Sequence, residues 1–164
     1  MRKKIFTFYL TALISAVLFA SLITAYGTEP ELRIVHNEFL DSPPPDVRVL
    51  PNGIMILTGI SNQYWSGGGW DGYVVQEYRM VMRPPELGGM VTGEGYGVFE
   101  GSVDGKYGTV RYRLKNVIPG GVFEDGQGTI SLLKGTGELA GLKGQGTLDF
   151  VNGNSEIYMH FEPS

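Results

Sequence analysis

Acid–base chemistry has one candidate pair in this sequence. His36 and Glu38 stand two residues apart in an apolar stretch. In an extended strand, side chains two residues apart lie on the same face. If that face points inward, the pair is placed for proton transfer. The other register buries Val35, Asn37 and Phe39 and leaves His36 and Glu38 in water.

Other catalytic groups are sparse. The chain has two histidines, His36 and His160, and no cysteine, and neither His-x-His nor His-Glu-x-x-His spacing occurs. The sequence therefore predicts no metal site. It also lacks the Gly-x-Ser-x-Gly turn of serine hydrolases. An enzyme built from these residues would be a cofactor-free cyclase or isomerase that uses a few polar groups, such as Glu38, Gln76 and Asn116.

Aromatic residues provide a different kind of candidate site. The segment from Tyr64 to Tyr73 carries two Trp and two Tyr around three consecutive glycines. Exposed aromatic rings stack on ligand rings, and clusters of them mark interaction sites. Tyr64, Trp65 and Trp70 are therefore candidate ligand contacts. The alternative is that these rings plug one end of the fold around a hairpin.

The N-terminus predicts export. Arg2, Lys3 and Lys4 precede an uncharged stretch that runs to Thr28, with small residues near Gly27. This pattern is typical of a secretory signal, although about 20 apolar residues can also span a bilayer. We expect residues 1–27 to be a signal peptide or a membrane anchor. Residues 28–164 would then form a single domain, secreted or tethered at the outer side of the cytoplasmic membrane.

Composition and net charge limit the classes of partner that this chain can bind. Three of the 13 basic residues lie in the leader, so residues 28–164 keep 10 basic against 17 acidic residues, a net charge of −7. An acidic domain without a basic cluster argues against nucleic acid as a partner. The absence of cysteine rules out disulfides. Of the 25 glycines, 24 follow Gly27, which is typical of an all-β chain with many turns.

Turn signals divide the domain into eight predicted strands. Asn-Gly and Asp-Gly pairs favour hairpins because both residues accept positive φ. They occur at 52–53, 71–72, 104–105, 125–126 and 152–153. The proline-rich segment 42–46 is expected to be a stiff connection outside any sheet. The predicted strands are 32–40, 54–65, 72–82, 91–103, 107–117, 128–134, 144–151 and 155–161. They predict a closed antiparallel barrel, with a two-sheet sandwich as the alternative.

Alternation along the strands predicts which side chains line the interior. It selects Gln76, Tyr78 and Met80 from one strand and Tyr112 and Asn116 from another. The further core residues expected are Ile54, Ile56, Ile60, Leu148 and Phe150. An eight-stranded barrel is either filled by side chains or holds one small ligand. The many glycines between 93 and 101 favour a space inside.

Three glycine-rich segments resemble a known family. Residues 121–129 and 135–144, the latter reading Gly-Thr-Gly-Glu-Leu-Ala-Gly-Leu-Lys-Gly, look like a bacterial domain-of-unknown-function family of the allene oxide cyclase-like barrel superfamily. Residues 99–108 are similar to the strand pair that precedes them there. The resemblance covers about 93–161. It implies an allene oxide cyclase-like or calycin-like barrel of about eight antiparallel strands, with homo-oligomers common among related barrels, and no activity to carry over.

Three functions follow from these observations. We favour binding of a small, largely apolar ligand in or at the mouth of the barrel. Its expected contacts are Tyr64, Trp65, Trp70, Gln76, Tyr78, Met80 and Tyr112. The alternatives are a cofactor-free enzyme that uses His36, Glu38 or Asn116, and a structural or interaction role at the cell surface.

Overall fold

The computed structural model describes residues 29–122, 125–149 and 153–162. The expected leader, residues 1–27, lies outside the described residues. So do Phe150, which we expected in the core, and Asn152 of one hairpin signal. No helix in the described residues combines the length and apolar character needed to cross a bilayer.

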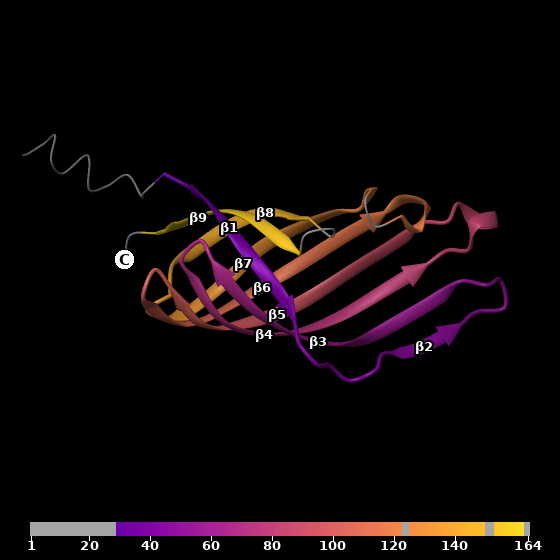
Figure 1. Ribbon diagram of the computed structural model, residues 1–164, viewed down its shortest axis with the longest axis horizontal. Coiled ribbons are helices and arrows are strands. Elements are labelled where there is room, and N and C mark those ends of the chain that lie inside the picture. Colours follow the sequence, from indigo (N-terminus) through magenta and orange to yellow (C-terminus); the bar gives the residue numbers. More distant parts are fainter. Residues whose placement is uncertain (1–28, 123–124, 150–152, 163–164) are drawn as a thin grey trace, which may run out of the picture.

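The described residues form nine antiparallel strands in one sheet that closes on itself (Figure 1). They are β1 (Glu31–Phe39), β2 (Asp46–Val49), β3 (Met55–Gly67), β4 (Trp70–Met82), β5 (Val91–Val103), β6 (Lys106–Ile118), β7 (Gln127–Gly137), β8 (Leu142–Asp149) and β9 (Asn154–Phe161). Two short 3-10 helices, η1 (Pro85–Leu87) and η2 (Pro119–Gly121), link β4 to β5 and β6 to β7. The sheet order is β1-β9-β8-β7-β6-β5-β4-β3-β2, and β1 also pairs with β3. The predicted eight-stranded closed barrel is confirmed, with β2 as an added strand.

Closure depends on β1 changing its partner. Its first part pairs with β9 as far as His36↔Asn154, and its last part pairs with β3 from His36↔Ser66 to Phe39↔Gln63. The chain then stays beside β3, because the Leu40 N–H donates to the Asn62 carbonyl at 2.9 Å. Of the predicted 42–46 connection, residues 42–45 lie outside the sheet, whereas Asp46 is the first residue of β2. Residues 46–49 form a strand that the prediction missed.

One end of the barrel, where β3–β4, β5–β6 and β7–β8 turn, is filled; we call it the closed end. Trp65 and Trp70 are each 2% exposed and meet edge to face at 5.5 Å between ring centroids. Trp70 also packs against Phe99 at 4.8 Å. Leu139 and Leu142 are fully buried beside them. The two tryptophans of the aromatic segment therefore plug the barrel, as the alternative weighed from the sequence expected, whereas Tyr73 is 64% exposed.

The β3–β4 hairpin turns three residues earlier than predicted. Gly67, Gly68 and Gly69 all have positive φ, whereas Asp71 and Gly72 lie inside β4. A Cβ at Gly72 would lie 2.4 Å from the Glu100 carbonyl oxygen of β5. Gly72 is therefore explained by a close strand approach, and the hairpin prediction at 71–72 was wrong.

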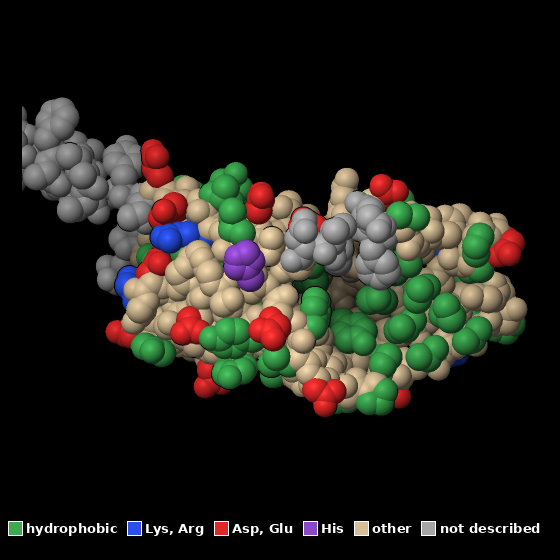
Figure 2. Space-filling model, in the orientation of Figure 1, with side chains coloured by type: hydrophobic (Ala, Val, Ile, Leu, Met, Phe, Trp, Pro, Cys, Tyr) green, Lys and Arg blue, Asp and Glu red, His purple; other side chains and the backbone are tan. Residues whose placement is uncertain are grey.

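At the opposite end the strands extend past the closing pairs; we call this the open end. There β3, β4, β5 and β6 continue beyond β1. Strand β2 pairs with the first residues of β3, from Asp46↔Thr58 to Val49↔Met55. Figure 2 shows hydrophobic side chains gathered around a hollow over this half of the molecule. The open end is a curved, largely apolar trough that continues the barrel interior.

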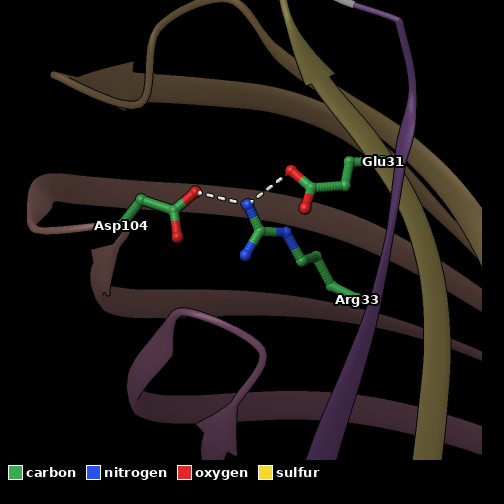
Figure 3. A network of polar contacts seen from close by, with 3 residues as sticks. All are labelled: Glu31, Arg33 and Asp104. Atoms are coloured by element: carbon green, nitrogen blue, oxygen red, sulfur yellow. Dashed lines mark hydrogen bonds and ion pairs between the residues drawn. The ribbon is translucent and has the colours of Figure 1, made fainter.

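An ionic contact ties β1 to the closed end (Figure 3). The Arg33 guanidinium donates to Glu31 at 2.7 Å and to Asp104 at 3.2 Å. Asp104 lies in the β5–β6 turn with φ of 52°. The contact joins Arg33, on the strand that closes the barrel, to a turn 71 residues later in the sequence.

Side-chain alternation was predicted correctly for β4 and β6 and wrongly for β3. Gln63 and Trp65 are buried, so the odd-numbered residues of β3 point inward, whereas Ile60 is 41% exposed. Ile60 pairs with Glu77 on the outer face, and Leu57 pairs with Met80 on the inner face. Ile56 and Ile60 were therefore assigned to the wrong face, because their partners in β4, Val81 and Glu77, belong to the outside.

Glycines 135 and 146 lie where the backbone of β7 approaches the β7–β8 turn and that of β8 approaches β9. A Cβ at Gly135 would lie 1.8 Å from the Leu139 carbonyl oxygen, and one at Gly146 would lie 1.8 Å from that of Glu156. Neither distance permits a side chain, so the backbones approach each other more closely than any other residue allows. The glycine run is a packing requirement of the β7–β8–β9 corner.

Replacing Gly146 with alanine tests this requirement. The added methyl group forces β8 from β9, so Gly146→Ala is expected to lower the free energy of unfolding by about 3 kcal/mol. Gly105→Ala is the control, because nothing lies within 4 Å of its Cβ and only its φ of 77° is unfavourable. That cost is about 1 kcal/mol. Urea unfolding measures both, and equal losses would contradict the packing explanation.

Candidate functional site

The open half of the barrel contains a cavity of about 480 Å³. Its walls are mainly apolar, with Phe39, Leu57, Met80, Leu114, Ile118, Ile130 and Leu148 contributing. Prolines 43, 44 and 45 border the mouth. Trp65 forms the boundary with the closed end, since it belongs both to the buried core and to the cavity lining. The space is a cup with an aromatic floor.

A row of glycines on β5 creates this space. Gly93, Gly95 and Gly97 alternate along the inner face of the strand. A Cβ at Gly97 would lie 2.3 Å from the Tyr112 ring, and one at Gly93 would lie 2.3 Å from Asn116 Oδ1. The glycines let these larger side chains lie against the β5 backbone. The space expected from glycines in this strand is present.

Uncharged hydrogen-bonding groups cover the cavity floor. The Tyr112 hydroxyl donates to Gln76 Oε1 at 2.7 Å, and the Trp65 indole N–H donates to Gln63 Oε1 at 3.0 Å. The Gln63 amide in turn donates to Ser61 Oγ at 3.2 Å. Tyr112 also packs on Trp65 with ring centroids 4.8 Å apart. These contacts hold the polar groups in fixed positions.

Burial keeps the Tyr112 phenol neutral. The side chain is 1% exposed, and loss of solvation raises its pKa well above the ordinary value of 10.0. A phenolate in this position would lose its hydration without a cation to replace it. Tyr112 therefore acts as a hydrogen-bond donor over the whole physiological pH range.

Most predicted ligand contacts lie around the cavity, but two do not. Trp65, Gln76, Tyr78, Met80 and Tyr112 line it, as does Asn116. Trp70 lies in the filled closed end. Tyr64 belongs to the outer face, where its hydroxyl donates to Asp71 and its ring meets Tyr73 at 5.1 Å. The aromatic segment is therefore divided between the floor, the plug and the outer surface.

The acid–base pair predicted on β1 does not face the interior. Val35 is fully buried, whereas His36 and Glu38 lie on the exposed face. His36 Nδ1 contacts Asn154 Oδ1 at 2.6 Å instead. The register that buries Val35 is the one adopted, so the condition for an interior His36–Glu38 pair fails. Asn116 lines the cavity on the other face of the sheet from both.

The adopted register brings in groups that the sequence did not single out for the site. Asn37 and Phe39 line the cavity, and the Asn37 amide donates to Ser155 Oγ at 2.9 Å. Gln63 joins them from β3. The spacing of Gln63 and Trp65, two residues apart, was the signal that would have identified this face. In the described part of the chain, no three His, Asp or Glu side chains come together as metal ligands.

Comparisons with known proteins show the fold. No protein-family model matches the chain, and no curated protein matches it. Among solved structures, a protein of unknown function from the DUF3224 family of Shewanella oneidensis MR-1 superposes with a TM-score of 0.69. The two chains are 17% identical, and the match covers 83% of this chain and 100% of that one. At this identity the likeness shows a shared barrel fold, and the structure that it matches comes from a family of unknown function.

The floor contacts predict the effect of removing one hydroxyl. Tyr112→Phe leaves Gln76 Oε1 buried without its donor, so we expect a loss of about 2 kcal/mol in the free energy of unfolding. Tyr107→Phe is the matched control, because Tyr107 is 67% exposed and its loss should stay within about 0.5 kcal/mol. Denaturant unfolding at neutral pH compares the two, and equal effects would show that the Tyr112–Gln76 contact contributes nothing.

The same variant predicts a difference at high pH. Above about pH 10 the unfolded chain releases the Tyr112 proton while the folded chain keeps it, because the folded pKa is raised. The wild type should therefore lose up to about 1.4 kcal/mol per pH unit more than Tyr112→Phe above pH 10. Unfolding measured from pH 8 to 11.5 tests this. Parallel curves for the two proteins would mean that the phenol is solvated.

Proposed function

We propose that this protein binds one small, uncharged, largely apolar molecule in the open half of its barrel. The observation that carries the proposal is the cavity of about 480 Å³ with apolar walls and a few fixed polar groups. Sites for small molecules have volumes of about 300–1,000 Å³ and this same combination of lining groups. The polar floor orients the ligand, and the walls supply affinity through buried apolar area.

The lining favours an uncharged ligand. Among the described residues that form it there is no lysine or arginine, and Glu94 is the one ionisable carboxyl group. Glu94 lies at an exposed position and pairs with Arg113 at 3.0 Å. An anionic ligand would enter this cavity without a counter-ion, and burying an unpaired charge is costly. A hydroxyl, carbonyl or amide group would instead meet the neutral donors and acceptors of the floor.

The arrangement favours binding over the two alternatives. The enzyme hypothesis used an interior His36–Glu38 pair or polar groups such as Glu38, Gln76 and Asn116. Gln76 and Asn116 line the cavity, but both acid–base residues lie on the outer face. A surface role rested on an exposed aromatic patch, and Trp65 and Trp70 are buried. A hollow interior suits a binding protein and also an enzyme that takes its substrate into the barrel, so the outward position of His36 and Glu38 is what favours binding.

We also propose that the chain belongs with the allene oxide cyclase-like barrels and acts outside the cytoplasmic membrane. The glycine motif at 135–144 and the eight-stranded closure support the first proposal. The basic residues 2–4 followed by an uncharged stretch support the second. The ligand would then be taken from the cell envelope or the surroundings.

A neutral fluorescent probe tests the binding function. N-phenyl-1-naphthylamine is uncharged and fluoresces in apolar sites, so the wild type is expected to bind it saturably with one probe per chain. Met80→Trp fills the cavity and should weaken binding by about tenfold or more. Val75→Trp is the control, because Val75 lies on the outer face of the same strand and is 53% exposed.

The outcomes separate cavity binding from surface adsorption. Loss of affinity in Met80→Trp alone supports the proposal. Equal affinities in all three proteins would place the probe elsewhere and overturn it, as would the absence of saturable binding. Thermal unfolding of each variant confirms that the barrel is retained.

A further inference from the structure

Strand β2 leaves one edge of the sheet unpaired. In the described part of the chain it ends the strand order, with β3 on one side only. Its four residues, Asp46 to Val49, are all exposed. Exposed strand edges present free N–H and C=O groups that can pair with another chain.

The backbone direction of β2 follows from the turn beyond it. The Leu50 N–H donates to the Ile54 carbonyl at 2.8 Å, so the polar backbone groups of Leu50 point towards β3. In an antiparallel ladder the direction alternates from residue to residue. Asp46 and Arg48 therefore also bond to β3, and the N–H and C=O groups of Val47 and Val49 point to the free edge.

The side chains of β2 are arranged for pairing with themselves. Val47 pairs with Leu57 and so shares the cavity face, yet it is 57% exposed. Asp46 and Arg48 pair with Thr58 and Ile56 and occupy the outer face. Two opposite charges therefore flank a central exposed valine.

We propose that two copies of this chain pair through β2, antiparallel, about a twofold axis at Val47. In this register Val47 lies opposite the partner's Val47. On each side of the axis, the Asp46 of one copy lies opposite the Arg48 of the other. The two Val47 residues exchange two hydrogen bonds, and each Val49 N–H donates to the partner's Pro45 carbonyl. Opposite charges directly across a strand pair stabilise it, so charge complementarity selects a second copy as the occupant of this edge.

Two prolines bound the paired segment. Pro45 and Pro51 flank the strand and have no N–H to donate. In the proposed pair Pro45 contributes its carbonyl, and the Val49 carbonyl stays in water because Pro45 has no N–H to donate. A shift of two residues either way would place Arg48 opposite the partner's Arg48 or Asp46 opposite the partner's Asp46, so the charges select the register. The twofold axis uses the free edge of both copies, so the pairing closes at two copies, with the two apolar troughs side by side.

Charge exchange tests the pairing in the protein as the cell produces it. The wild type should sediment as a dimer at about 100 µM, well within the affinity range of small interfaces. Arg48→Glu opposes two pairs of carboxylates and is expected to weaken dimerisation by about tenfold or more. The double variant Asp46→Arg with Arg48→Glu restores opposite charges and should dimerise like the wild type. Arg111→Glu, an equal charge change at an exposed position of β6, is the control.

A cross-link supplies a second readout. The chain has no cysteine, so Val47→Cys introduces a single thiol. Directly opposed residues in a hydrogen-bonded pair have Cα atoms about 5.5 Å apart, which suits a disulfide. We expect Val47→Cys to form a covalent dimer under mild oxidation and Val75→Cys to stay uncoupled. A monomeric wild type without this cross-link would overturn the proposal, as would a dimer that survives Arg48→Glu or a double variant that stays monomeric.

Discussion

Four residue pairs between β1 and β3 determine the character of this molecule. They run from His36↔Ser66 to Phe39↔Gln63 and turn a curved sheet into a barrel. Because β1 leaves β9 as it joins β3, closure is complete at one end only. Beyond these pairs β3 to β6 continue without β1 across from them, so the interior of the barrel is open there. The cavity and the unpaired edge of β2 both follow from this local closure.

The same strands fill one half of the barrel and leave the other hollow. Along the inner face of β5, Val103 and Phe99 pack against the tryptophan plug, and the next three inner positions are Gly97, Gly95 and Gly93. The inner face of β5 thus changes from large side chains to glycines within one strand. It sets the depth of the cavity and leaves Tyr112 and Asn116 room to lie against the β5 backbone. The size of the residues at alternate positions of β5 therefore determines which half of the barrel is packed and which half is hollow.

Turn chemistry and alternation predicted the architecture well, because both are local properties. They identified eight strands and the inner face of β4 and β6. Which face of β1 points inward was not local: Leu32 and Ile34 suggest the even face, yet they are 42% and 49% exposed. The face is set by pairing with β3, 24 to 30 residues away, and with β9, 118 to 128 residues away. Strand β2 escaped prediction for the same reason, since a four-residue strand beside prolines exists only through its partner.

The claim that one half of the barrel is hollow can be tested directly with xenon. Apolar cavities of sufficient size take up xenon, whereas packed interiors do not. Crystals pressurised with xenon should show a strong anomalous peak among Met80, Leu114 and Tyr112 and none among Trp70, Phe99 and Leu139. A side chain or loop occupying the first position, with no xenon inside the barrel, would contradict the account.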